Sequence, residues 1–406
     1  MKKFNNIIFN DNISKSYLKY KKLKKNNLFL KNALNEIYKN LNKKKDVFHS
    51  LSSSFKLGFN KNQLSKYKRF KKVAIVGMGG SALGVKAIYS FLESKIKKEF
   101  FFFDNLDEVQ IKVIKKRKIL KNALFIIISK SGNTIETLIN SDLLFGMKLN
   151  SSNTILITER RNNFLNTFSK RKNIPIIAHK TYIGGRYSVL SEVGMLPAYL
   201  MGLKINNLRK NLLKSFEDKR KNLIIENILK NFQFHSSKKI NSMIFFNYCP
   251  QLNDFAYWCQ QLIAESLGKN GKGILPVVSP APKDHHSLLQ LYLDGPKDKV
   301  FYVISSKGSY NTKSSKNFFE KSFKFLKNKK LNKIILSKKE AFLSVLKRKK
   351  IPFREIQIKN FSEETIGELF SYFMIETVMT GLLMNINPFN QPAVEEVKVL
   401  TKKNLS

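Results

Sequence analysis

Acidic residues and cysteines are both scarce in this chain of 406 residues. The two cysteines, Cys249 and Cys259, are too few for a disulfide framework or a zinc site. The N-terminal segment has no continuous apolar core of the kind that a signal peptide needs. The nearest approach to a membrane span, Leu369 to Met384, contains a glutamate and is shorter than the roughly 20 residues that a span requires. We therefore expect a cytoplasmic protein with no membrane partner, in which 369–384 is a buried core helix.

The shortage of acidic residues leaves a large positive charge. There are 74 Lys and Arg residues against 29 Asp and Glu, which gives a formal net charge of +45. Such an excess often indicates a nucleic-acid-binding protein. Here lysine is spread along the whole chain beside abundant Asn, Ile and Phe, a bias that AT-rich codons produce, without a basic arm or an RNA- or zinc-type motif. We therefore expect no nucleic-acid partner, and a field that attracts anionic metabolites in a salt-dependent way.

Short apolar runs alternate with helical stretches from Val73 onward. Buried parallel strands need continuous apolar runs, and their alternation with helices is typical of a doubly wound sheet. The first series of runs is VAIV, EFFFFD, ALFIII, TILIT and IPIIA. After the charged stretch 206–239 comes a second series, which is SMIFFN, GILPV, VFYVIS, KIILS and REIQI.

This pattern predicts an α/β protein with two doubly wound parallel-sheet domains, each an αβα sandwich. We predict a helical N-terminal cap at 1–50, a first α/β domain at 51–205, a second at 206–385 and a helical tail at 386–406. At 43% hydrophobic residues, the chain is long enough for each of the two domains to have its own core.

The segment VAIVGMGGSALG places Gly80 and Ser81 between a strand and a helix. Glycines at this position let the backbone approach an anion, and the helix N-terminus supplies unpaired N–H groups. The pattern GMGGSA also loosely fits a dinucleotide fingerprint, with Asp104 near the position of a ribose-binding acid. A tight turn formed for packing is a third interpretation of the same residues.

The stretch SKSGNT predicts a second anion-binding loop. Ser129, Lys130, Ser131 and Thr134 follow the apolar run LFIII at the point where another helix begins. Loops at the carboxyl ends of strands can share one crevice, which is the usual ligand position in open α/β sheets. A nucleotide fold would not need a second, hydroxyl-lined loop, whereas a terminal phosphate has several oxygens to satisfy. We therefore expect a phosphate to bind at these two loops.

Two segments carry candidates for a base and for an oxyanion partner. In WCQQLIAE, Gln261 and Glu265 lie at helical spacing on an apolar stripe. Desolvation there would raise the pKa of the carboxylate toward neutrality, which suits a general base. A position at the edge of a surface helix is the alternative. In GGRYS, Arg186 follows two glycines and could hold a developing oxyanion.

Two further segments supply a histidine and a lysine. In KDHHS, His286 lies in a predicted first helical turn with Asp284 as N-cap, where the helix dipole favours neutral imidazole. A surface histidine is the competing interpretation. In NQPAVEEVK, Gln391 and Lys398 are seven residues apart, so they would share one face of a terminal helix.

Together these segments resemble the glucose-6-phosphate isomerase family. Six segments each match a family motif and occur in the family's order between Val73 and Lys398: GMGGSALG, SKSGNTIET, GGRYSVLSEVGMLP, QLIAESLGK, HHSLLQLYLDGP and NQPAVEEVK. The resemblance implies two sugar-isomerase (SIS-type) domains, a sugar-phosphate substrate, a homodimer, and no metal or organic cofactor. The implied reaction interconverts glucose 6-phosphate and fructose 6-phosphate through a cis-enediol.

The resemblance also implies a role for each candidate residue. Glu265 would move a proton between C2 and C1, and Arg186 would stabilise the enediolate. His286 and Lys398 would open the sugar ring, and in the family this histidine reaches the site of the neighbouring subunit. The other candidates would bind substrate, with Gln261 and Gln391 at the sugar and with Gly80, Ser81, Ser129, Lys130, Ser131 and Thr134 at the phosphate.

Three other interpretations stay open. A bifunctional phosphoglucose/phosphomannose isomerase shares the glycine loop and SGNT. A non-catalytic sugar-phosphate sensor of the same fold should lack Glu265 and have a DNA-binding helix-turn-helix, of which the first 50 residues show no clear sign. A dehydrogenase would bind NAD at the glycine loop, and soaking the protein with NAD would test this.

Overall fold

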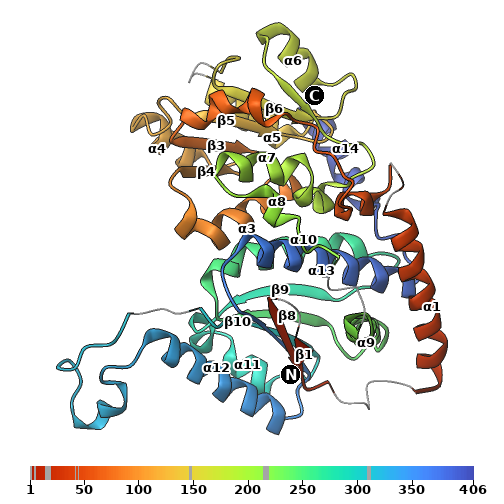
Figure 1. The fold of residues 1–406 in the computed structure, drawn as a ribbon, viewed down its shortest axis with the longest axis vertical. Helices are drawn as coiled ribbons and strands as arrows, with labels where there is room; N and C mark the ends of the chain where they lie inside the picture. The colour runs from red at the N-terminus through yellow and green to blue at the C-terminus, as the bar shows by residue number, and fades with distance from the viewer. Residues whose placement is uncertain are drawn as a thin grey trace.

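Two parallel sheets lie one above the other, with a layer of helices between them and further helices on their outer faces (Figure 1). The structure is a computed structural model that describes residues 2–3, 6–13, 20–41, 43, 45–145, 149–213, 219–308 and 312–406. The predicted fold class, α/β with two doubly wound sheets, is confirmed.

The first sheet has five parallel strands in the order β4-β3-β5-β6-β7. Their bounds are β3 Lys72–Val76, β4 Glu99–Phe103, β5 Leu124–Ile128, β6 Thr154–Thr158 and β7 Ile176–Ala178. Because β4 and β5 lie on opposite sides of β3, the topological switch point of this sheet lies between β3 and β5. In open α/β sheets this is where ligands bind.

The second sheet has the same arrangement around its own first parallel strand. Its order is β1-β2-β11-β10-β8-β9, and the parallel strands are β8 Ser242–Asn247, β9 Leu275–Pro280, β10 Lys299–Ser306 and β11 Phe353–Ile358. β9 and β10 flank β8, so the switch point lies between β8 and β10. The antiparallel strands β1 Lys2–Lys3 and β2 Ile7–Asp11 extend the sheet beyond β11.

The prediction of a helical cap at 1–50 is wrong for its first residues. Helix α1, Tyr20–Asn40, and the short helix η2, Val47–Leu51, are helical as predicted, but β2 is a strand of the second sheet. The apolar run of β2 is too short to show a period. Pairing with β11 decides its conformation, because an unpaired strand edge offers a complete row of backbone partners.

The run KIILS is also wrong as a strand, because it lies inside helix α12, Leu331–Arg348. The apolar residues of α12 that pack on the second sheet recur at helical spacing: Ile335, Phe342, Leu343 and Leu346. A short apolar run is the same in a strand and in one face of a helix, and only the longer window separates the two.

The inner helices join the two sheets through one apolar core. They are α3 Leu83–Leu92, α7 Glu192–Leu200, α8 Ile205–Leu208, α9 Lys219–Ser236, α10 Asn253–Leu267 and α13 Glu363–Leu383. Separate, smaller cores lie under the outer helices, which are α4 Glu108–Lys116, α5 Ile135–Phe145, α6 Phe164–Lys172, α11 Leu289–Asp294 and α12. The inner faces of the sheets therefore share one core instead of having one each.

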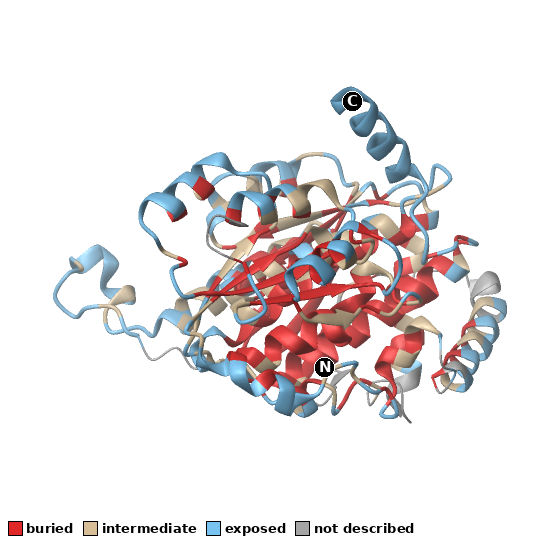
Figure 2. Ribbon diagram, turned by 90° about the horizontal axis from the view of Figure 1, so that it is seen from above, coloured by how far each residue is buried: buried red, intermediate tan, exposed pale blue. Residues whose placement is uncertain are grey.

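Helix α13 is long and apolar enough to cross a membrane, but 89% of its apolar window is buried inside the fold. It packs against α8, α9 and α10 in the inner layer. Its Glu376 forms a buried ion pair with Arg354 of β11 at 2.5 Å. The prediction of a buried core helix is confirmed. By contrast, the C-terminal helix α14, Ala393–Leu405, projects from the body and has no buried residue (Figure 2).

Candidate active site

The glycine loop after β3 is packed against the segment that carries Arg186. The loop continues through the short helix η4, Gly79–Ser81, into α3. A Cβ atom on Gly80 would lie 2.2 Å from the carbonyl carbon of Gly185, so no side chain fits at Gly80. Gly185 begins the short helix η6, Gly185–Leu190. The absence of a side chain at Gly80 therefore brings the backbone of Arg186 up to the loop.

Three hydroxyl groups converge in the loop after β5, at the start of α5. The Oγ of Ser129 lies 2.9 Å from the Oγ1 of Thr134, and the Oγ of Ser131 lies 3.5 Å from the same atom. Gly132 has φ of +71°, which favours glycine, and its N–H donates to the Oγ of Ser129 at 3.1 Å. Because the first N–H groups of a helix have no partner within the helix, hydroxyls and amides together can surround an anion here.

The glycine loop and the hydroxyl loop are neighbours across the switch point. A Cβ on Gly77 would lie 2.9 Å from the carbonyl oxygen of Ile128 and 3.0 Å from the Cβ of Ser81. The glycine loop thus touches the last residue of β5, directly before Ser129. The structure brings the two predicted phosphate loops side by side at the carboxyl edge of the first sheet.

Lys130 belongs to the hydroxyl loop, but its amine turns to other partners. The Nζ donates to the carbonyl of Thr181 at 2.8 Å and lies 3.6 Å from the Oε1 of Glu159. Burial lowers the pKa of Lys130, and the charge of Glu159 opposes that shift. In this arrangement a phosphate could meet only the backbone of Lys130, and not its charged end as the sequence suggests.

Glu265 is held at both carboxylate oxygens. Nη1 of Arg186 donates to its Oε2 at 3.1 Å, and Nε2 of Gln261, one turn earlier on α10, donates to its Oε1 at 2.9 Å. The side chain of Glu265 is 32% exposed. The prediction of a desolvated carboxylate on an apolar stripe is therefore wrong in one respect, because Glu265 is ion-paired and partly open to solvent.

The guanidinium of Arg186 has a partner for each of its five N–H groups, and its side chain is only 1% exposed. Besides Glu265, these partners are the Oγ of Ser266 at 2.8 Å, the Oε1 of Gln391 at 2.8 Å, and the carbonyls of Pro388 at 2.6 Å and Asn390 at 3.2 Å. With so many fixed partners the guanidinium cannot turn away. Its positive charge therefore stays beside the carboxylate.

Gln261 connects the carboxylate with the glycine loop. A Cβ on Gly79, where φ is +51°, would lie 2.7 Å from the Nε2 of Gln261. The amide that donates to Glu265 is therefore in contact with the loop. The candidate base and the candidate phosphate loop are one side chain apart.

The C-terminal segment reaches this cluster, but its helix does not. Gln391 accepts a hydrogen bond from Arg186, whereas Lys398 is exposed and donates to Glu395 on the same helix at 2.6 Å. The prediction that Gln391 and Lys398 share one helical face is wrong, because α14 begins only at Ala393. Among the described residues, no hydrogen bond or ion pair joins Lys398 to the cluster.

The two adjacent histidines have different surroundings. Nε2 of His285 lies 2.6 Å from the hydroxyl of Tyr248, and the ring packs against Phe246. Burial lowers the pKa of His285, and the charges of Lys338 and His286 lower it further. His286 is exposed, and no hydrogen bond among the described residues joins it to Glu265 or Arg186.

The predicted helix start at Asp284 is wrong. The histidines lie in a single 3-10 turn, η9, Lys283–His286. The carboxylate of Asp284 accepts from Ser279 at 2.7 Å and from Ser287 at 3.0 Å instead of capping a helix. The macrodipole argument for a neutral His286 therefore does not apply, because such a dipole needs a longer helix.

Lys269 is a site residue that the sequence analysis missed. Its Nζ donates to the carbonyl of Asn387 at 2.5 Å. Burial, reinforced by the charge of Arg186, lowers the pKa of Lys269 to about 8, and Glu265 opposes the shift. Helical spacing from Glu265 could not have found it, because α10 ends at Leu267 and Lys269 lies beyond the helix.

Lys269 is one of several donors that hold the segment 384–391, which we term the tail segment. Lys272 donates to the carbonyl of Met384 at 2.9 Å, and the hydroxyl of Tyr187 donates to that of Pro388 at 2.9 Å. With Lys269 and Arg186, these donors bind four carbonyls of the tail segment. Gln391 is thereby fixed at the end of an otherwise irregular stretch.

The two-sheet fold is shared with solved structures that include a sugar-phosphate isomerase. A hypothetical protein from Thermus thermophilus superposes with a TM-score of 0.84 at 23% identity, over 98% of this chain and 100% of that chain. A glucose-6-phosphate isomerase from Chlamydia trachomatis superposes with a TM-score of 0.69 at 18% identity, over 85% of this chain and 71% of that chain. At such identities these similarities establish the fold alone.

The chain belongs to the phosphoglucose isomerase family, whose family model matches residues 18–406. A glucose-6-phosphate isomerase from Methanocaldococcus jannaschii is 35% identical over 349 residues, 82% of this chain and 85% of that protein. One from Campylobacter jejuni is 30% identical over 373 residues, 88% of this chain and 91% of that protein. The family inferred from the six motifs is confirmed.

Proposed function

We propose that this protein is an aldose–ketose isomerase that interconverts D-glucose 6-phosphate and D-fructose 6-phosphate. One observation carries the proposal: Glu265 is held by Arg186 and Gln261, and Gln261 touches the glycine loop of the phosphate crevice. A hexose 6-phosphate has its anion at one end and its reacting carbons C1 and C2 at the other. A base that lies one side chain away from an anion-binding loop can therefore reach C1 and C2 while the loop holds the phosphate.

The first sheet binds the phosphate in this proposal. The hydroxyls of Ser129, Ser131 and Thr134, with Ser81 from the neighbouring loop, donate to phosphate oxygens at the start of α5. Hydrogen bonds to a charged group are stronger than those between neutral groups. The phosphate carries the same charge throughout the reaction, so these contacts stabilise ground state and transition state alike.

Glu265 transfers the proton in this proposal. Its carboxylate takes the proton from C2 of the open-chain aldose, the C–H electron pair forms the C1=C2 double bond, and the C1 oxygen gains the negative charge. The proton of the C2 hydroxyl moves to the C1 oxygen, which shifts the negative charge to the C2 oxygen. Return of the proton from Glu265 to C1, as the C2 oxygen forms its carbonyl bond, then gives the ketose. Arg186 stabilises the enediolate with a charge that is already in place, which requires no reorganisation during the step. Gln261 and Gln391 line the sugar.

Ring opening needs a proton donor and acceptor, and among the described residues neither His286 nor Lys398 is hydrogen-bonded to Glu265 or Arg186. We propose that the protein is a homodimer in which the second copy supplies His286. We also propose that it acts in glycolysis and gluconeogenesis in the cytoplasm. Two features support the homodimer. His286 is exposed, and α14 carries exposed apolar residues with no cover in the single chain: Val394, Val397, Val399, Leu400 and Leu405. Docking of α14 on the second copy would also move Lys398 from solvent to a protein surface.

A coupled assay tests the reaction. The full-length chain, without added metal, should convert fructose 6-phosphate to glucose 6-phosphate. Mannose 6-phosphate in the same assay separates the bifunctional alternative, which would convert it as well. The dehydrogenase alternative is disfavoured because Asp104, the candidate ribose ligand, is ion-paired with Lys86 at 2.9 Å. No conversion of fructose 6-phosphate by well-folded protein would refute the proposal.

Mixed dimers test the shared site. Glu265→Gln chains and His286→Ala chains should each be inactive, and unfolding and refolding them together should restore activity. Random pairing makes about half of the dimers mixed, each with one intact site, so roughly a quarter of wild-type activity is expected. If mixed dimers form and stay inactive, His286 does not act across the interface.

A further inference from the structure

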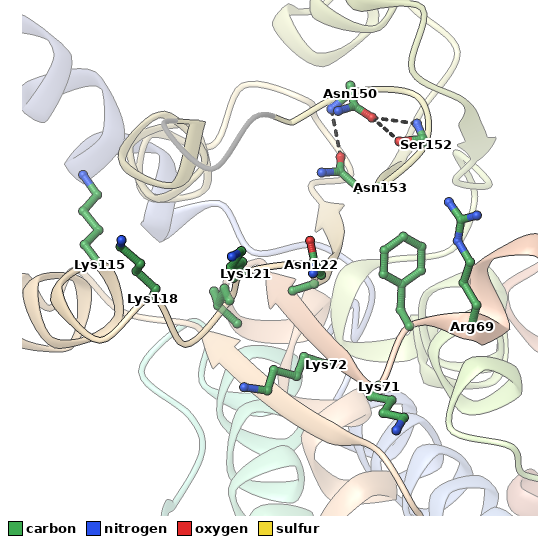
Figure 3. A pocket seen from close by; sticks show the side chains of 13 residues that line it. Arg69, Lys71, Lys72, Lys115, Lys118, Lys121, Asn122, Asn150, Ser152 and Asn153 are labelled. Atoms are coloured by element: carbon green, nitrogen blue, oxygen red, sulfur yellow. Dashed lines mark hydrogen bonds between the residues drawn. The ribbon is translucent and has the colours of Figure 1, made fainter.

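A second concave site lies at the opposite edge of the first sheet from the candidate active site. A pocket of about 1220 Å³ opens at the N-terminal ends of β3, β5 and β6 (Figure 3). Three segments line it: 69–72 before β3, 115–123 between α4 and β5, and 150–153 before β6. The glycine and hydroxyl loops follow the other ends of β3 and β5, so a strand of roughly 16 Å separates the two sites.

The lining of this pocket has six cations and no acidic residue: Arg69, Lys71, Lys72, Lys115, Lys118 and Lys121. None of the ion pairs among the described residues involves any of the six, although nearby lysines on α3, on α4 and in the loop after β5 pair with Asp104, Glu108 and Glu159. Figure 3 shows these side chains around the opening, with Asn150, Ser152 and Asn153 on a facing loop. A concave surface lined by one sign of charge concentrates counter-ions.

The high net charge of the chain does not by itself account for this arrangement, as a second lysine run shows. Helix α4 ends in KKRK, residues 115–118, and α12 ends in KRKK, residues 347–350. In both runs the last lysine has a left-handed backbone, with φ of +50° at Lys118 and +55° at Lys350. Cations at a helix C-terminus are favoured by the helix dipole, which explains both runs.

The first run is joined in its pocket by cations from another segment of the chain. Lys115 and Lys118 share the pocket with Arg69, Lys71 and Lys72, whereas Lys349 of the second run lies 3.8 Å from the carboxylate of Asp294. The pocket therefore gathers more positive charge than the helix end requires. The excess points to an anionic ligand with several charges.

We propose that this pocket binds a linear chain of phosphates, inorganic polyphosphate. The volume is above the usual range of small-molecule sites, so one phosphate group would leave most of the cations without a partner. An extended chain that carries a charge on each unit can neutralise cations from both basic segments at once. The release of condensed counter-ions then favours binding at low salt.

The same lining argues against a nucleic acid. Single-stranded nucleic acid binds where bases can stack on free aromatic faces. The aromatic ring of this lining is Phe70, which stacks with Tyr67 at 6.5 Å and lies under the guanidinium of Arg69 at 5.2 Å. The Phe70 ring therefore already has two stacking partners in the chain.

Recognition of base edges also requires free hydrogen-bond acceptors, and the amide oxygens of the facing loop are already bonded. The Oδ1 of Asn150 accepts from the backbone N–H of Ser152 at 2.8 Å and from its hydroxyl at 2.6 Å. The Oδ1 of Asn153 accepts from the backbone N–H of Asn150 at 2.9 Å. Since these oxygens are bonded within the loop, the pocket offers mainly donors and cations, which suits phosphate oxygens.

Binding of end-labelled inorganic polyphosphate to the full-length chain, followed by fluorescence anisotropy over a range of salt concentrations, tests the proposal. The triple variant Lys115→Gln, Lys118→Gln, Lys121→Gln should bind at least about tenfold more weakly, and its slope of log affinity against log salt should fall by about 2. The matched control Lys347→Gln, Arg348→Gln, Lys350→Gln removes the same charge from the same local geometry and should change affinity less than about twofold. Both variants should keep wild-type isomerase activity, which verifies folding.

Three results would overturn the proposal. Equal loss of affinity in the two triple variants would mean that polyphosphate binds the whole basic surface. Tighter binding of single-stranded RNA with the same number of phosphates, weakened by the same pocket variant, would make the pocket an RNA site. Tripolyphosphate that binds as tightly as the long chain would show that a compact anion is the ligand.

Discussion

The two sheets have the same strand order around their switch points, but only one has loops that suit an anion. The end of β5 and the loop after it have the residues ISKSG, and the end of β10 and the loop after it have the similar residues ISSKG, of which the first three still belong to the strand. The neighbouring strands differ. β3 is followed by GMGGS, whereas β8 is followed by YCPQ. The hydroxyl–lysine–glycine loop therefore has a glycine-rich neighbour only in the first sheet.

At the second switch point the backbone is bonded to its own chain. Nδ2 of Asn247 donates to the carbonyl of Cys249 at 2.7 Å, and the N–H of Cys249 donates to the Oδ1 of Asn247 at 3.0 Å. Burial raises the pKa of the Cys249 thiol to about 12, so the thiol stays neutral. The first N–H groups after β8 are therefore not arranged for an anion, because that of Cys249 is bonded to Asn247. This comparison is our reason for assigning the proposed anion site to a pair of loops and not to one loop.

In the proposed reaction the second half contributes in another way, through α10. This helix brings Gln261 into contact with the glycine loop of the first sheet and holds Glu265 one turn further on. The proposal therefore assigns phosphate binding to the first half of the fold and the base to the second half. Substitutions should separate the two roles kinetically.

The largest effect is expected for Glu265→Gln. Loss of the general base should lower kcat by about 10²- to 10⁴-fold, while affinity for inorganic phosphate should stay near that of the wild type because the loops are intact. Steady-state kinetics and phosphate competition measure the two quantities. Near-normal exchange of the C2 proton with solvent in this variant would exclude Glu265 as the base.

Removal of a hydroxyl from the first sheet should weaken binding instead. Ser129→Ala and Thr134→Ala each delete a bond to a charged group, which is worth about 1.5–3 kcal/mol. KM should then rise roughly 10- to 150-fold with little change in kcat. The matched control is Ser306→Ala, which removes a hydroxyl from the end of β10 and should leave KM unchanged. Equal effects of Ser129→Ala and Ser306→Ala would remove the distinction between the sheets.

The next effect tests whether the glycine loop must touch the Arg186 segment. A Cβ on Gly80 would lie 2.2 Å from the Gly185 backbone, whereas one on Gly185 would have its nearest neighbour at 3.9 Å. Gly80→Ala should therefore lower the free energy of unfolding by about 1–3 kcal/mol and reduce activity, and Gly185→Ala should do neither. Denaturant unfolding and kcat/KM measure both. A tolerated Gly80→Ala would show that the contact is dispensable.

The smallest effect is expected for Lys269, which binds the tail segment through one hydrogen bond. Lys269→Met deletes the bond to Asn387, so KM should rise only a few-fold, as expected for one bond of about 0.5–1.5 kcal/mol. The pKa of Lys269 is lowered to about 8, so its positive charge is present below pH 8 and is lost as the pH rises through that value. The difference in KM between wild type and Lys269→Met should therefore shrink above pH 8. A constant difference from pH 6 to 10 would mean that the charge of Lys269 plays no part.

Much of the fold and site could be predicted because the signals are local. Continuous apolar runs such as LFIII must be buried on both faces, so they predict parallel strands directly. Glycines and hydroxyls at strand ends indicate anion loops through backbone geometry alone. For the same reason, spacing along one helix was enough to pair Gln261 with Glu265.

What the tertiary structure decided depends on partners distant in sequence. β2 is a strand because β11 presents an open edge, and KIILS is helical because its face packs on the second sheet. The direction of individual side chains could not be predicted from the sequence either. Lys130 turns its amine to Thr181 and Glu159, and Gln391 meets Arg186 only because the tail segment folds back. A sequence fixes which groups a chain has and which neighbours they have within a few residues. The packing of distant segments determines which buried donors and charges find partners. The free energy of these long-range contacts is gained only when the whole core forms.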